Sequence, residues 1–142
     1  PQARTYATHA LQRKKKTPDA TLLSDEIHWP GLETIATGGS VKLGECVFYH
    51  APSKTLILTD LAFNITRSSS SFTRFFMKLN GAYGHFGPSR LFRFLLVDQP
   101  KALHDSIQRI LRWDFETIVL AHGEVVTQDG HDLFRRAFAY LD

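Results

Sequence analysis

Two side chains capable of metal chemistry stand directly after two apolar segments of this chain. Asp60 follows the run Leu56–Thr59, and His122 follows the run Thr117–Ala121. Aliphatic and β-branched runs of this kind are typical of strands that are covered on both faces of a sheet. In α/β proteins, ligands and catalytic groups gather at the carboxyl ends of such strands. Carboxylate and imidazole groups suit zinc, manganese or iron, so we expect Asp60 and His122 to be candidate metal ligands.

A metal site with only these two residues would be incomplete, because zinc sites use three or more protein ligands. None of the other histidines forms a His-x-His or His-x-x-x-His pair. His85, in a glycine-rich loop, is the strongest additional candidate. His50, before a predicted turn, is a second candidate, with a structural role as its alternative. The sequence contains no Gly-x-Ser-x-Gly elbow and no Gly-x-x-x-x-Gly-Lys loop, so nucleophilic catalysis has no support.

The elements that must position these residues follow from hydrophobic periodicity. Alternating residues predict strands over 32–37 and 45–50, and a turn at 51–53 predicts a hairpin with the strand that ends at Asp60. Apolar stripes predict helices over 100–111 and 130–141. Strands followed by helices in this order indicate a layered α/β sandwich, and 142 residues are enough for one domain with its own core.

A basic and aromatic insertion separates the two candidate ligands. Residues 61–97 contain no Asp or Glu, and Phe72, Phe75, Phe76 and Leu79 have the spacing of an amphipathic helix. A second apolar helix is predicted over 91–97. The simplest interpretation packs both helices on the sheet; the alternative is a contact surface for a protein partner or a membrane. The basic residues of that surface would be Arg74, Lys78, Arg90 and Arg93.

Composition narrows the class of protein. An apolar share of 43% and a charged share of 22% indicate a globular chain. No apolar run approaches the roughly 20 residues that span a bilayer, so we expect a soluble or peripheral protein, inside a cell or organelle. The net charge of +3 is mild, and nucleic acid is not a favoured partner, because the basic run 13–16 suits the last turn of a helix. The single Cys46 is expected to be a buried structural thiol.

Several phrases resemble the metallo-β-lactamase superfamily. Residues 54–63 are similar to its strand followed by Gly-Asp-x-Leu-Phe, and residues 119–123 are similar to its last strand, which ends in Gly-His-Gly. More closely, the chain resembles an uncharacterised branch called domain of unknown function 4336. The phrases that carry this closer resemblance are 1–6, 48–56, 59–65, 79–84, 109–115 and 121–125.

The resemblance implies a four-layer αββα sandwich, with residues 1–142 forming roughly its C-terminal half as a single partial domain. It also implies that Asp60 bridges two metal ions and that His122 ligates one of them. Two departures matter. The superfamily's His-x-His-x-Asp-His motif would lie upstream of Pro1, and its middle metal His, expected near 37–40, is absent from the sequence. No cofactor is therefore expected in this chain alone; zinc, iron or manganese would require upstream ligands.

Two functions remain open at this point. The first is a pseudoenzyme: a non-catalytic structural or binding subunit with a degenerate metal site, part of a larger assembly that covers the sheet face left open by the missing half. The second is a metal-dependent hydrolase whose remaining ligands lie upstream of Pro1. The residues do not decide between them, so whether the protein is an enzyme, and on what substrate, is left undecided.

Overall fold

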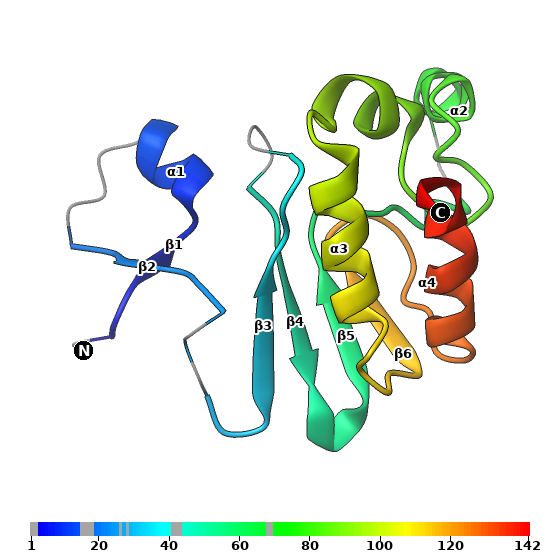
Figure 1. The fold of residues 1–142 in the computed structure, drawn as a ribbon. Coiled ribbons are helices and arrows are strands. Elements are labelled where there is room, and N and C mark those ends of the chain that lie inside the picture. Colours follow the sequence, from blue (N-terminus) through cyan, green and yellow to red (C-terminus); the bar gives the residue numbers. More distant parts are fainter. Residues whose placement is uncertain (1–2, 15–18, 26, 28, 41–43, 68–69) are drawn as a thin grey trace.

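A four-stranded sheet with helices on one face forms the centre of the structure (Figure 1). The computed structural model describes residues 3–14, 19–25, 27, 29–40, 44–67 and 70–142. The strands, in spatial order, are β3 (Leu32–Ala36), β4 (Cys46–His50), β5 (Thr55–Leu58) and β6 (Thr117–Leu120). Helices α3 (Pro100–Ile110) and α4 (Gly130–Phe138) cover one face, and the short turn η3 (Ala139–Leu141) follows α4.

The N-terminal segment forms a small separate unit beside this sheet. It contains β1 (Tyr6–Ala7), α1 (His9–Lys14) and β2 (Thr21–Leu22), and β1 pairs with β2 in parallel. Aromatic contacts join it to the sheet: the ring of Trp29 lies 5.2 Å from that of Tyr6 and 6.4 Å from that of Phe48. The side chains of the basic run 13–16 lie outside the described residues.

Strand pairing determines which ends of the strands meet at each edge of the sheet. β4 and β5 are antiparallel and are joined by the 3-10 turn η1 (Ala51–Ser53), so the predicted hairpin is confirmed. β5 and β6 are parallel, with Leu58 opposite Leu120. Because parallel strands run in the same direction, their carboxyl ends meet at one edge of the sheet. The residues that follow β5 and β6 are therefore brought together.

The core lies between the sheet and helices α3 and α4. The predicted apolar stripes of both helices face inward, and the even-numbered residues of β5 and β6 meet them from the sheet. Tight packing of this kind is the main source of the stability of the fold. The side chains at its centre, each 2% exposed or less, are Leu56, Leu58, Ile118, Leu103, Ile107, Ile110, Phe134 and Phe138.

Helix α2 (Ser71–Leu79) forms as predicted, but the prediction that its apolar stripe packs on the sheet is wrong. Phe72 is 78% exposed and Phe75 is 67% exposed, and the helix has no buried residue. Periodicity identifies an apolar stripe without identifying what the stripe faces. Here the inward side of α2 carries the half-buried Thr73 and Met77 instead.

The second predicted helix of the insertion is a single π-helical segment, η2 (Phe92–Leu96). The Val97 N–H donates to the Phe92 carbonyl at 3.2 Å, which is the i to i+5 bond of a π-helix. Phe92 is buried, whereas Phe94 and Leu95 are 79% and 67% exposed. Among the described residues, no helix has the length and apolar character needed to cross a membrane.

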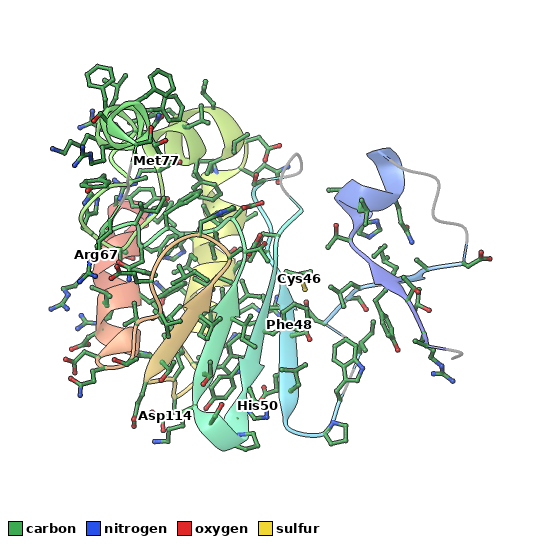
Figure 2. All side chains as sticks on the ribbon, turned by 180° about the vertical axis from the view of Figure 1, so that it is seen from behind. Cys46, Phe48, His50, Arg67, Met77 and Asp114 are labelled. Carbon is green, nitrogen blue, oxygen red and sulfur yellow. The ribbon has the colours of Figure 1, made fainter. Side chains whose placement is uncertain are left out.

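The face of the sheet opposite α3 and α4 is only partly covered. Phe48, Ile57 and Val119 form one row across β4, β5 and β6 on this face. All three are partly exposed, Val119 at 36%. Figure 2 views the molecule from this side and shows β4 and β5 with no helix in front of them.

Replacing Leu56 by Ala tests the core. Leu56 has no exposed surface, so its truncation leaves a cavity and should lower the free energy of unfolding by about 2–5 kcal/mol. Val125→Ala is the control, because Val125 is 50% exposed, and it should change stability by less than about 0.5 kcal/mol. Urea denaturation measures both, and equal effects would contradict this assignment of the core.

Candidate functional site

Asp60 and His122 lie side by side at the edge of the sheet where β5 and β6 end. The His122 Nε2 is 2.9 Å from the Asp60 Oδ1, a hydrogen bond between the two candidate ligands. Their side chains are 48% and 49% exposed. The Phe63 ring stacks on the imidazole, with centroids 5.4 Å apart and planes inclined by 17°. The parallel pairing of two strands far apart in sequence therefore brings together the two residues that the sequence singled out as candidate ligands.

A buried carboxylate, Glu45, supports the Asp60 backbone from behind. Its side chain belongs to a residue only 4% exposed and accepts three hydrogen bonds. The donors are the Thr59 N–H at 2.7 Å, the Thr59 hydroxyl at 2.5 Å and the Asp60 N–H at 3.2 Å. Sequence reasoning assigned Glu45 only to the start of a strand. The sole signal for a further role was an acidic residue next to the apolar run of β4.

The backbone that carries His122 is fixed by close contact with the segment after Asp60. The Asn64 N–H donates to the His122 carbonyl at 3.2 Å, and the Glu124 N–H donates to the Asn64 carbonyl at 2.8 Å. Gly123, between them, has φ +113°, and a Cβ there would overlap the Asn64 carbonyl oxygen. The glycine that follows His122 is thus required by chain packing.

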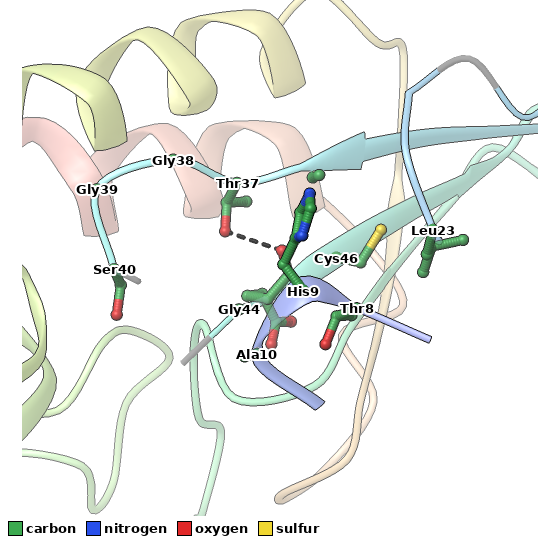
Figure 3. Close-up of a pocket in the computed structure, with 12 residues that line it drawn as sticks. Thr8, His9, Ala10, Leu23, Thr37, Gly38, Gly39, Ser40, Gly44 and Cys46 are labelled. Carbon is green, nitrogen blue, oxygen red and sulfur yellow. Dashed lines mark hydrogen bonds between the residues drawn. The ribbon is translucent and has the colours of Figure 1, made fainter. Parts of the chain in front are cut away.

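The segment expected to carry a middle metal His, residues 37–40, packs against α3. A Cβ on Gly39 would lie 2.5 Å from the Gln99 oxygen and 2.6 Å from the Leu103 nitrogen. The Gly39 carbonyl accepts from the Asp98 and Gln99 N–H groups at 2.9 and 3.3 Å. On its other side this segment lines a cavity of about 340 Å³, shared with Cys46 and with His9 of α1 (Figure 3).

The other candidate histidines lie apart from this pair. His50 ends β4 at the opposite end of the hairpin, where its Nδ1 is 2.7 Å from the Ser53 hydroxyl. That contact fits the structural alternative. His85 is exposed and lines a cavity with Arg90, Arg93 and Arg136.

The four basic residues predicted to form a contact surface divide into two kinds. Arg74, Lys78 and Arg90 are exposed. Arg93 is half-buried: its guanidinium lies 3.9 Å from the centroid of the Tyr140 ring and donates to the Ala137 carbonyl at 3.3 Å. Arg93 therefore also joins η2 to the C-terminal part of the chain.

The donor set at the Asp60–His122 pair is small. Within the described part of the chain, no group of three or more His, Cys, Asp or Glu residues is arranged to hold a metal ion. Glu45 lies next to the Asp60 backbone, but its carboxylate already accepts hydrogen bonds from Thr59 at the end of β5. The described residues thus supply two ligands, one carboxylate and one imidazole.

Comparison with known proteins now identifies the fold. No protein-family model and no curated protein matches the chain. It is similar to the solved structure described as the peroxy diiron species of the chemotaxis sensor ODP (TM-score 0.60, 16% identity) and to that of DIM-1 metallo-β-lactamase (TM-score 0.57, 18% identity). The chain has the metallo-β-lactamase fold. The matches cover 98% of this chain and 59% of each of those chains, consistent with the expected C-terminal half of the αββα sandwich.

Replacing Glu45 by Ala tests the support behind Asp60. The change removes the acceptor for three donors at the end of β5, so we expect a loss of about 2–4 kcal/mol in the free energy of unfolding. Glu116→Ala is the matched control, since Glu116 is exposed and its partner Lys54 keeps Asp114 at 2.9 Å. The control should cost less than about 1 kcal/mol. A Glu45→Ala protein as stable as the control would contradict this role.

Alkylation of Cys46 tests its assignment as a structural thiol. Burial raises the pKa of the Cys46 thiol to about 12, with smaller contributions from the negative charges of Asp25 and Glu45. Since only the thiolate reacts, native protein at about pH 8 should react with iodoacetamide at least about a hundredfold more slowly than free cysteine. Denaturation in urea should restore the ordinary rate, and a rapid native reaction would show the assignment to be wrong.

Proposed function

We propose that this protein is a non-catalytic structural or binding subunit with the metallo-β-lactamase fold and a degenerate metal site. The observation that carries the proposal is the direct hydrogen bond between His122 and Asp60. In this arrangement the two inherited ligand positions satisfy each other, and the described residues supply no third ligand. Two ligands alone would hold a divalent ion weakly and leave its bound water poorly activated.

The packing of residues 37–40 supports this proposal. A functional site of the superfamily type requires a histidine near this segment, but Gly39 touches the first turn of α3 so closely that it has no room for a side chain. The neighbouring Gly38 N–H donates to the Ser106 hydroxyl at 2.9 Å. The segment serves the junction between β3 and α3 instead of a metal.

The partly open sheet face supports a role in a larger assembly. The row formed by Phe48, Ile57 and Val119 leaves apolar surface in contact with solvent, and such a surface is stabilised when a second layer covers it. We therefore propose a protein layer over this face as the partner. The motifs quoted above further favour the branch called domain of unknown function 4336.

The alternative is a metal-dependent hydrolase, and it rests on the placement of Asp60 and His122 at adjacent strand ends. In that case Asp60 Oδ1 and His122 Nε2 would hold the metal together with ligands upstream of Pro1. A bound metal would supply a water molecule of lowered pKa as the nucleophile. Glu45 would position Asp60 through its backbone, and Phe63 would restrict rotation of the His122 ring.

Metal analysis of the full-length protein, including any residues upstream of Pro1, separates the two functions. We expect purified protein to contain much less than one equivalent of zinc, iron and manganese, with no change in the variants Asp60→Ala and His122→Ala. Both side chains are half exposed, so these variants should fold. His50→Ala is the control for non-specific loss of a histidine. Stoichiometric metal that is lost in both site variants and kept in the control would refute the non-catalytic proposal in favour of the hydrolase.

A further inference from the structure

A large apolar patch on the insertion is exposed to solvent. Its residues come from α2, from η2 and from Leu91 directly before η2, and they are 46% to 79% exposed. Scattered exposed apolar residues are normal on soluble proteins, but a contiguous group of large ones marks a contact site. The members from α2 form such a group, because their i, i+3, i+4, i+7 spacing places them on one face of the helix. The members, here called the outer patch, are Phe72, Phe75, Phe76, Leu79, Leu91, Phe94 and Leu95.

The outer patch projects from one end of the molecule. Figure 1 shows α2 beyond the end of the sheet, and Figure 2 shows ring-bearing side chains pointing outward from it. The inner side of α2 is already occupied through Thr73 and Met77. The apolar stripe is therefore free to contact an apolar environment outside the protein, as the apolar face does in helices that lie in the plane of a membrane surface.

The charged residues within the insertion are of one sign. Residues 61–97 contain no Asp or Glu. Arg74 and Lys78 are one helical turn apart beside the apolar stripe of α2, and both are exposed. Arg90 lies at the junction between α2 and η2, where its Nη1 donates to the Leu79 carbonyl at 3.4 Å. A patch bordered in this way attracts an anionic surface.

A basic cavity adjoins the outer patch at Arg90. It has a volume of about 430 Å³, and its charged lining residues are Arg90, Arg93, Arg136 and, when protonated, His85, with no Asp or Glu among its lining residues. Arg93 is held in place by Tyr140 and the Ala137 carbonyl, and its buried Nε–H has no hydrogen-bond partner among the described residues. Guanidinium groups arranged like this are suited to phosphate oxygens.

We propose that this protein docks peripherally on an anionic lipid bilayer through the outer patch, with a lipid phosphate bound in the basic cavity. The aromatic and leucine side chains enter the interfacial layer, while Arg74, Lys78 and Arg90 meet the headgroups. A membrane fits these observations better than a protein surface does. The patch is projecting and made of Phe and Leu alone, whereas protein interfaces mix apolar with hydrogen-bonding groups. This inference goes beyond the proposed function and does not depend on its outcome.

Vesicle flotation of the full chain tests the proposal. Vesicles of phosphatidylcholine mixed with phosphatidylglycerol should bind the protein at least about tenfold more tightly than vesicles of phosphatidylcholine alone, and salt should weaken binding. Phe72→Ser/Phe75→Ser should reduce binding about tenfold or more through lost apolar burial. Arg74→Glu/Lys78→Glu should reduce it by about fivefold per residue or more. None of these side chains is buried, so circular dichroism should show unchanged folding.

Matched variants and competitors exclude other occupants. Arg112→Glu reverses an exposed charge after α3, outside the patch, and should bind vesicles like the wild type. Arg136→Glu should weaken binding if the cavity holds a lipid phosphate. Equal binding to both vesicle types, full binding by Phe72→Ser/Phe75→Ser, or complete release by excess inorganic phosphate would overturn the proposal. Light scattering that shows a dimer without lipid, lost in the same double variant, would also overturn it and assign the patch to a second copy.

Discussion

The parallel pairing of β5 with β6 is the constraint on which the rest of this structure depends. Register brings Leu58 opposite Leu120, so the residues beyond both strands emerge at one edge. A parallel pair requires a long crossover, and here the crossover contains the whole insertion and α3. The segment after β5 must leave the sheet at this edge. Helix α3 must then bring the chain back, along the face of the sheet that the helices cover, to the start of β6. Figure 1 shows α2 at the end of the sheet where β5 finishes, and Asp60 and His122 follow the ends of β5 and β6.

The end of β5 is held by an unusual buried charge. Removing a carboxylate from water is costly unless hydrogen bonds compensate it, and Glu45 receives that compensation from the backbone and side chain of Thr59 and from the Asp60 N–H. The same bonds join the start of β4 to the end of β5. The support of the Asp60 backbone thus comes from a residue that is an ordinary strand-entry position in the sequence.

Sequence patterns predicted the hairpin, the two strands that end before Asp60 and His122, and the inward stripes of α3 and α4, because each of these depends on local periodicity or on turn residues. The parallel pairing of β5 with β6 was not predicted, because it joins segments distant in sequence. They did not predict the direction in which α2 faces. The stripe at Phe72 and Phe75 has the same spacing as a core stripe, and only the completed fold shows that no layer of the described chain meets it. The support by Glu45 and the inward turn of Arg93 also depend on contacts between residues distant in sequence. Asp60 and His122 were singled out as strand-end residues, and the structure places the Asp60 Oδ1 and the His122 Nε2 2.9 Å apart.

The two residues that follow β6 in the His122–Gly123 motif are constrained for different reasons, as the close approach of Gly123 to Asn64 shows. The glycine is imposed by the crossing of two backbone segments, whereas the preceding histidine is free to change without disturbing that crossing. A sequence comparison that gives most weight to the glycine would detect the shared fold. One that gives most weight to the histidine would detect the capacity to bind a metal. Relatives that kept the first signal and lost the second would still align well, so similarity at this strand end measures shared topology and says little about turnover.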